Sequence, residues 1–219
     1  METPSGNVES ASASGTNYTE GASGLSTELS PELVASVPQR PQRADAARNY
    51  DKLIAAAREA FTTDGEDASL EGIARSAGVG IGTLYRNFPT RQALLEAVYV
   101  EEVQGICRAV QDFEGQAPWE ALVGWLRRFA GYAATKQALA GELMAYMDAG
   151  STVFPQCRHA ITTAGEPLLA AAQRSGDVRP DVQFMDVVRM VGGIATIANA
   201  EPGQVDRIIA VALDGLRAR

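Results

Sequence analysis

The chain has 219 residues, 46% of them hydrophobic, so it can bury a substantial core in one domain or two small ones. Its formal net charge is −8, and its two cysteines are too few for a disulfide framework. No window approaches the roughly 18 uninterrupted apolar residues of a membrane helix. Residues 1–39 lack the basic and long apolar parts of a signal peptide, so we expect a reduced, cytoplasmic protein with no membrane partner.

The negative charge is spread unevenly along the chain. Residues 1–39 contain five acids and no Lys or Arg, whereas residues 40–100 contain as many bases as acids. A neutral region can bind DNA when its bases gather on one face, so the net charge does not exclude a nucleic-acid partner. The bases proposed for such a face are Arg40, Arg43, Arg48, Arg86 and Arg91.

Residues 1–39 are dominated by Ser, Gly, Thr, Ala and Glu, and such a segment buries too little apolar surface to offset the entropy of ordering. We predict a disordered acidic tail here and assign it no role. Pro38 and Pro41 mark its end. An amphipathic helix is then predicted over residues 44–62, because Tyr50, Ile54 and Phe61 recur at helical spacing.

Residues 68–91 have the layout of a helix-turn-helix. Ser69 can cap a helix whose apolar residues Leu70, Ile73, Ala74 and Ala77 form one stripe. Gly78 ends that helix, in the position where a left-handed residue costs least.

A second short helix follows, in which Leu84 and Phe88 point inward. Its outward side chains can donate hydrogen bonds to phosphate oxygens and base edges; they are Thr83, Tyr85, Arg86 and Asn87. A plain helical hairpin is the alternative interpretation of the spacing alone.

Helical periodicity continues through the rest of the chain. Thr90 can cap a long helix reaching about residue 113, and Pro118 can open the next one. Further helices are predicted over about 119–132, around 139–147, over 154–174, and in two final segments near 184–198 and 205–216. No strand-like alternation is found, so the predicted fold is all-α: a three-helix helix-turn-helix domain and a larger helical C-terminal domain.

Residues 50–61, 69–74, 78–88 and 91–95 together resemble the tetracycline-repressor (TetR) family of bacterial regulators, and the resemblance covers about residues 44–100. It implies a homodimer in which three N-terminal helices bind double-stranded palindromic operator DNA. It also implies a larger helical domain that binds a small molecule, which releases the DNA. On this basis the expected domains are the tail (1–39), the DNA-binding domain (40–91) and the effector-binding and dimerisation domain (92–219).

The resemblance implies that residues 80–87 are the recognition helix in the major groove. Ile81, Thr83 and Arg86 are then nearest the bases, while Tyr85 and Arg91 bind phosphates. The full expected DNA-binding set is Arg43, Ser69, Gly80, Ile81, Thr83, Tyr85, Arg86, Asn87 and Arg91. Because Gly80 and Gly82 leave the helix bare, part of the specificity is expected from DNA shape.

The C-terminal half is expected to hold a pocket for a small hydrophobic effector. Its predicted lining is Trp125, Phe129, Tyr132, Met144, Tyr146, Met147, Phe154 and His159. Tyr132, Tyr146 and His159 are the expected orienting groups. Ordinary core packing is the alternative for each of these residues, because aromatic stripes at helical spacing usually form core.

Cys157 and His159 lie two positions apart, so on a helix they point to different faces, and they cannot complete a zinc site without carboxylates. No Gly-rich phosphate loop, paired-acid pattern or Ser-His-Asp set is found. We therefore expect no catalytic residues, no cofactor and no metal, with a small helical enzyme built on these two residues as the weakest alternative.

Gly192 and Gly193 stand inside an apolar helix, where each costs about 1 kcal/mol relative to Ala. Close approach of another helix would explain them, so we predict a homodimer through the last two helices, forming a four-helix bundle. Burial within one subunit is the alternative.

The resulting hypothesis is a ligand-responsive repressor. Effector binding would shift the population toward a state whose recognition helices no longer fit major grooves roughly 34–36 Å apart. The second hypothesis is a regulator with a solid C-terminal core that is controlled by a protein partner.

Overall fold

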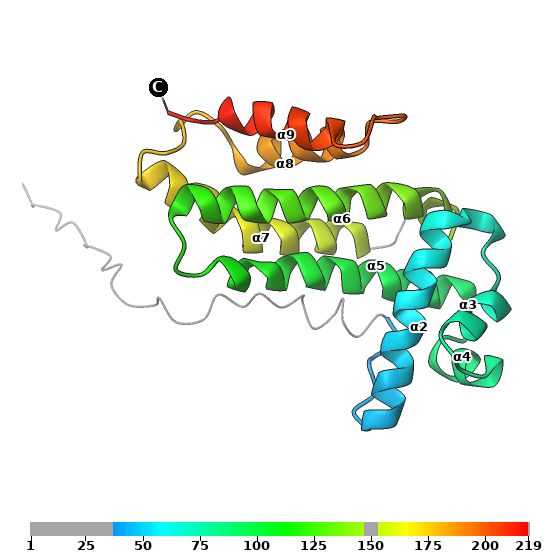
Figure 1. Cartoon of the computed structure of the whole chain (residues 1–219). Helices are drawn as coiled ribbons and strands as arrows, with labels where there is room; N and C mark the ends of the chain where they lie inside the picture. The colour runs from blue at the N-terminus through cyan, green and yellow to red at the C-terminus, as the bar shows by residue number, and fades with distance from the viewer. Residues whose placement is uncertain (1–36, 147–152, 219) are drawn as a thin grey trace, which may run out of the picture.

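The computed structural model describes residues 37–146 and 153–218. In chain order its elements are α2 (Ala44–Thr63), η1 (Gly65–Asp67), α3 (Leu70–Ser76), α4 (Ile81–Asn87), α5 (Arg91–Arg108), η2 (Ala109–Phe113), α6 (Pro118–Tyr146), α7 (Val153–Arg174), α8 (Phe184–Ala195) and α9 (Gln204–Asp214) (Figure 1). η1 and η2 are 3₁₀ turns. The one extended pairing among these residues is an isolated bridge between Val178 and Arg217, which confirms the predicted all-α class. Most of the predicted acidic tail, residues 1–36, lies outside the described residues.

The three N-terminal helices form the predicted helix-turn-helix at one end of the molecule (Figure 1). The Ser69 hydroxyl accepts a hydrogen bond from the Gly72 N–H at 3.0 Å and caps α3 as expected. Gly78 has φ +68°, the left-handed conformation that favours glycine after a helix. Leu84 and Phe88 are fully buried and anchor α4 to the domain core.

α6 is the central helix of the C-terminal domain and packs against α5, α7 and α8, while α9 covers α8 (Figure 1). Trp125 of α6 is fully buried, and its ring lies 5.8 Å from the rings of both Phe129 and Phe184. Gly165 of α7 faces this aromatic group so closely that a Cβ there would lie 2.5 Å from the Phe184 ring.

Two helix boundaries differ from the sequence prediction. The two helices predicted over 119–132 and around 139–147 are one 29-residue helix, α6, because residues 133–140 are rich in good helix formers. The single helix predicted to reach residue 113 is α-helical only to Arg108 and continues as the 3₁₀ turn η2. The Trp125 indole N–H donates to the Ile106 carbonyl at 3.0 Å just before this change of geometry.

Candidate nucleic-acid interface and internal pocket

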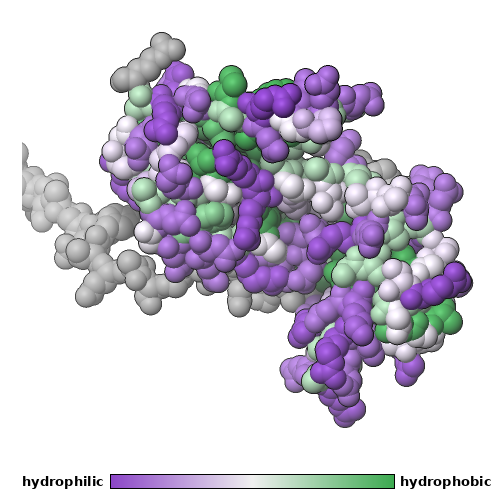
Figure 2. Space-filling model, viewed as in Figure 1, coloured by the Kyte–Doolittle hydropathy of each residue, from purple (hydrophilic) through white to green (hydrophobic). Residues whose placement is uncertain are grey.

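α4 exposes apolar side chains at the end of the molecule. Ile81 is 38% exposed and Tyr85 is 45% exposed, although both are large hydrophobic residues on a helix anchored by buried neighbours. Hydrophobic surface is visible over this end of the molecule, at the lower right of the space-filling view (Figure 2). Exposed apolar groups beside polar donors are typical of a surface that binds a partner.

The polar side chains of α4 are engaged only in local hydrogen bonds. The Arg86 Nε donates to the Gly82 carbonyl at 3.0 Å, and its Nη2 donates to the Thr83 hydroxyl at 3.3 Å. The Asn87 amide donates to the Thr83 carbonyl at 2.8 Å. The two Arg86 bonds are exposed to solvent, so the guanidinium can exchange them for a base edge or a phosphate at little cost.

Gly80 and Gly82 leave open space on the α4 surface. A Cβ placed on either residue would meet nothing within 4 Å, and both have negative φ values that any residue adopts. Packing within the chain therefore does not require glycine at these positions. A backbone or groove that approaches α4 closely would require it.

Arg91 and Ser69 make structural contacts within the domain. The Arg91 guanidinium lies 4.8 Å from the centre of the Phe61 ring and donates to the carbonyls of Gly65, at 3.0 Å, and Ala68. Ser69 is the α3 cap described above. The phosphate contacts expected of both residues stay predictions.

The three arginines near the start of α2 differ in their partners. Arg40 donates to both carboxylate oxygens of Asp51 at 2.7 Å, and this hydrogen bonding lowers the pKa of Asp51. Arg48 pairs with Asp45. Arg43 occupies the N-cap position of α2 and is exposed, and among the described residues it forms no ion pair.

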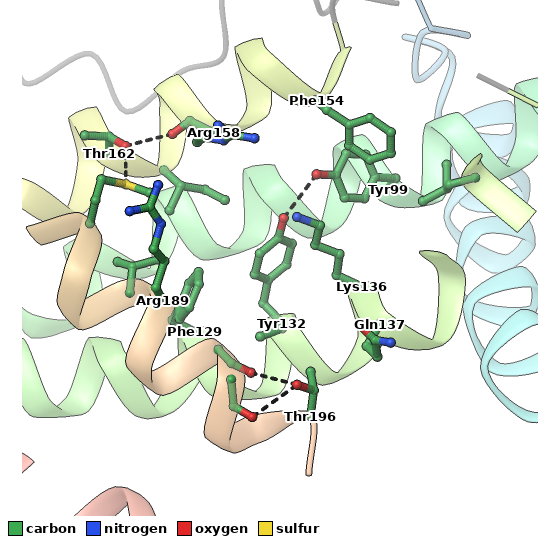
Figure 3. Close-up of a pocket in the computed structure, with 17 residues that line it drawn as sticks. Tyr99, Phe129, Tyr132, Lys136, Gln137, Phe154, Arg158, Thr162, Arg189 and Thr196 are labelled. Carbon is green, nitrogen blue, oxygen red and sulfur yellow. Dashed lines mark hydrogen bonds between the residues drawn. The ribbon is translucent and has the colours of Figure 1, made fainter. Parts of the chain in front are cut away.

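A cavity of about 630 Å³ lies between α5, α6, α7 and α8 (Figure 3). Its described lining is Tyr99, Phe129, Tyr132, Ala133, Lys136, Gln137, Leu143, Phe154, Arg158, Ile161, Thr162, Met185, Val188, Arg189, Gly192, Gly193 and Thr196. Three residues of the predicted set, Phe129, Tyr132 and Phe154, are among them. The volume lies within the range of ordinary small-molecule sites.

Two tyrosines from different helices meet in this cavity. The Tyr132 hydroxyl of α6 donates to the Tyr99 hydroxyl of α5 at 3.3 Å (Figure 3). Burial raises the pKa of both phenols, so both are neutral at physiological pH. Tyr99 also packs edge-on against Phe154, with ring centroids 5.3 Å apart, so α5 forms part of the pocket wall.

Two predicted pocket residues do not line this cavity. Trp125 lies in the core, where its N–H is already bonded to the Ile106 carbonyl. His159 is exposed, because it lies on a different face of α7 from the buried Cys157. The side chains of Met144 and Tyr146, and the whole of Met147, lie outside the described residues.

The sequence prediction missed most of the polar lining. Tyr99, Lys136 and Gln137, together with Arg158, Thr162 and Arg189, were not among its residues. Charged residues at helical spacing usually lie on a solvent-exposed face. The sequence around each of these residues does not indicate that three helices place them around one cavity. The spacing of Arg158 and Thr162, one turn apart on α7, was the available signal.

The surroundings of Cys157 argue against a thiol nucleophile. Burial raises its pKa to about 12, so the unreactive thiol dominates. The exposed His159 is not placed to activate it. Over residues 37–146 and 153–218, no group of three or more His, Cys, Asp or Glu residues is arranged to bind a metal. None of the described helices is long and apolar enough to cross a membrane.

An exposed second helix in a helix-turn-helix, joined to a larger helical domain around a cavity, defines the class of helix-turn-helix DNA-binding regulators. Comparison with known proteins agrees with this class. Residues 53–98 match the family "Bacterial regulatory proteins, tetR family", and residues 117–218 match "Transcriptional regulator SbtR-like, C-terminal domain".

Similar proteins cover most of the chain. The TetR transcriptional regulator SCO0520 from Streptomyces coelicolor is 42% identical, with a TM-score of 0.69, over 77% of this chain and 98% of that one. A TetR transcription regulatory protein from Mycobacterium vanbaalenii is 35% identical, with a TM-score of 0.67, over 81% of this chain and 100% of that one. The regulator UidR of Escherichia coli K12 is 26% identical over 145 residues, 64% of this chain and 74% of UidR.

The chain therefore belongs to the TetR family of bacterial transcriptional regulators, and it is a DNA-binding regulator. The resemblance inferred from residues 44–100 is confirmed. Members of this family are generally not enzymes.

Proposed function

We propose that this regulator is a repressor whose DNA affinity is controlled by a small molecule bound in the cavity. The observation that carries the proposal is the cavity of about 630 Å³. Tyr132 and Phe154 line this cavity. The protein-partner hypothesis expects a solid core around these two residues. We therefore prefer the small-molecule hypothesis to the partner hypothesis.

α5 supplies one physical connection between the pocket and the DNA-binding domain. Tyr99 of α5 lines the cavity, and Arg91 at the start of the same helix is bonded to the carbonyls of Gly65 and Ala68. Arg58 of α2 also pairs with Glu102 of α5. A ligand that moves Tyr99 would shift α5 and, through these contacts, α2 and the segment leading into α3.

The proposed DNA contacts are those of α4. Ile81, Thr83 and Arg86 would reach base edges, and Tyr85 would bind a phosphate. The local, exposed hydrogen bonds of Arg86 and the open surface at Gly80 and Gly82 support this arrangement.

We propose a homodimer through α8 and α9. Val211 of α9 is 74% exposed and Ile197, just after α8, is 41% exposed. Hydrophobic surface over α9 is visible at the top of the space-filling view (Figure 2). Gly192 and Gly193, from which the sequence predicted this interface, line the cavity, and a Cβ on Gly192 would lie 3.7 Å from Phe129 of α6. A pair of helices from each subunit would bury Val211 and Ile197 in a four-helix bundle.

The test is DNA binding by variants of α4. With a duplex from the region upstream of the protein's own gene, Arg86→Ala and Tyr85→Ala should each weaken binding about tenfold, roughly 1.4 kcal/mol. Arg127→Ala, an exposed arginine of α6 outside the cavity lining, is the matched control and should leave binding unchanged. Parental affinity in the two α4 variants, with unaltered folding, would show that α4 is not the recognition helix.

A further inference from the structure

The described lining of the cavity carries positive charge and no negative charge. Lys136 of α6, Arg158 of α7 and Arg189 of α8 are among its residues, and no Asp or Glu is among those described. These three residues line the same cavity from three different helices (Figure 3). A pocket built for a neutral hydrophobic compound has no need of this arrangement.

Lys136 and Arg158 repel each other in this setting. Burial, and then the charge of Arg158, lower the pKa of Lys136. The Lys136 amine lies 6.0 Å from the centre of the Phe154 ring. Within the described part of the chain, neither Lys136 nor Arg158 has a carboxylate within ion-pair distance.

Arg189 is only weakly neutralised. Its nearest carboxylate is that of Asp186, one turn away on α8, at 4.0 Å, and both side chains are about 70% exposed (72% and 68%). A pair this long and this exposed contributes little. The guanidinium of Arg189 can therefore turn toward a ligand at small cost.

Much of the remaining cavity wall is apolar, although hydroxyl and amide groups also line it. Phe129 and Phe154 supply aromatic surface, and Leu143, Ile161 and Val188 supply aliphatic surface. A fully polar ligand would leave this surface without a partner. A ligand that fits both the cationic and the apolar part of the cavity has one negatively charged group and a hydrophobic body.

We propose that the effector is a small amphipathic organic anion. Its carboxylate binds between Lys136 and Arg158, with Arg189 as a third cation, and its apolar or aromatic body packs against Phe129 and Phe154. An anion relieves the repulsion between the two cations and forms charge-assisted hydrogen bonds with both. A neutral hydrophobic ligand would desolvate the Lys136 ammonium further without compensation. This inference rests on the proposed function and defines the chemical class of its effector.

A carboxylate fits this site better than a phosphate ester. The planar guanidinium of Arg158 can bind either oxyanion through two parallel hydrogen bonds. A phosphate dianion, however, loses more hydration than a carboxylate does when it enters a pocket that also has apolar walls. Phenyl phosphate is therefore the probe that distinguishes a site for phosphate esters from a site for carboxylates.

The test uses the full-length protein without DNA and pairs of probes that differ only in charge. We would measure binding of decanoate and 4-phenylbutyrate, and of their amides decanamide and 4-phenylbutyramide, by calorimetry and by the shift in melting temperature. At least one carboxylate should bind about tenfold or more tightly than its amide, and more tightly than phenyl phosphate. Equal binding of acid and amide, no binding of either acid, or preference for phenyl phosphate would overturn the proposal.

Variants assign the effect to this cavity. Arg158→Gln and Lys136→Met should each weaken carboxylate binding about tenfold and leave amide binding unchanged, while Arg158→Lys should retain part of it. Arg174→Gln, an exposed arginine on α7 outside the cavity lining, is the matched control and should bind like the parent. Unchanged carboxylate affinity in both Arg158→Gln and Lys136→Met would overturn the proposal.

The same variants separate this inference from the proposed function. All of them keep α4 intact, so they should bind upstream DNA like the parent in the absence of a ligand. Carboxylates that bind at the cavity but never release DNA would contradict ligand control while leaving the anion site in place. Release of DNA by amides alone would support ligand control and overturn the anion site.

Discussion

At the scale of single residues, glycines at different places in the chain have opposite physical roles. Gly165 is required by packing, because a Cβ would lie 2.5 Å from Phe184 and 2.6 Å from Trp125, both buried. Gly82 is not required by packing, since a Cβ there meets nothing within 4 Å. The two glycines therefore allow stability and DNA binding to be tested separately.

Gly165→Ala should destabilise the protein. The added methyl overlaps two aromatic rings that have no free space, and overpacking of this kind costs about 1–3 kcal/mol. The free energy of unfolding in urea measures the effect. Gly131→Ala, at an exposed and open position of α6, should instead raise stability by up to about 1 kcal/mol. Equal stability of the two variants would contradict the close packing at Gly165.

Gly82→Ala should stabilise the protein and weaken its binding to DNA. Stability should rise by up to about 1 kcal/mol, because Ala favours the helix more than Gly does. Binding to upstream DNA should weaken about tenfold, roughly 1.4 kcal/mol, because the methyl group stands where the groove would approach α4. Urea unfolding and a fluorescence titration with DNA measure the two effects. A stabilised variant that keeps parental affinity would indicate that DNA does not approach this face.

At the scale of elements, α5 contacts both functional regions, and so does α6, which packs on α2 and also lines the cavity. The first residue of α5, Arg91, bonds to the loop between α2 and α3, and Tyr99 lines the cavity. This double contact follows from the length of α5 and needs no large movement to transmit a shift.

Arg91→Met tests the contact at the start of α5. The substitution keeps an apolar stem beside Phe61 but removes the donors to the Gly65 and Ala68 carbonyls. Loss of these charged donors should lower the free energy of unfolding by roughly 1–3 kcal/mol. Arg127→Met, on the exposed surface of α6, is the control. Unchanged stability together with weaker DNA binding would favour the phosphate contact predicted from the sequence over the structural one.

Val211→Glu tests the outer helices α8 and α9. If these helices pair with a second copy, a charge at this exposed apolar position should convert the dimer to a monomer of about 23.1 kDa. Sedimentation equilibrium gives the mass. Ala55→Glu, at an exposed position of α2, should leave the parental mass unchanged. A parental mass in both variants would place the dimer contact elsewhere.

At the scale of the whole molecule, local patterns in the sequence predicted the fold well. The Ser69 cap, the left-handed Gly78 and the inward pair Leu84 and Phe88 are short-range features, and the structure contains each of them. The family followed from the same stretch. Helix boundaries that depend on long-range contacts, such as the change to a 3₁₀ turn after Arg108, were not predicted correctly.

The pocket could be predicted only in part, because four helices far apart in the sequence form it. Aromatic stripes indicated Phe129, Tyr132 and Phe154, but they also indicated Trp125, which fills the core. Lys136, Arg158 and Arg189 are separated by more than twenty residues from one another, and each resembles a solvated surface residue in isolation. Only the packing of α6, α7 and α8 brings them to one cavity.

The most direct measurement of the central claim is a fluorescence titration of the protein with DNA from the region upstream of its own gene. It would be made at two salt concentrations, with an unrelated duplex as the control. For a sequence-specific regulator we predict binding to the upstream duplex at least about a thousandfold tighter than to the control. Weak and equal binding to both duplexes, falling steeply with salt, would indicate phosphate contact alone and would contradict the claim.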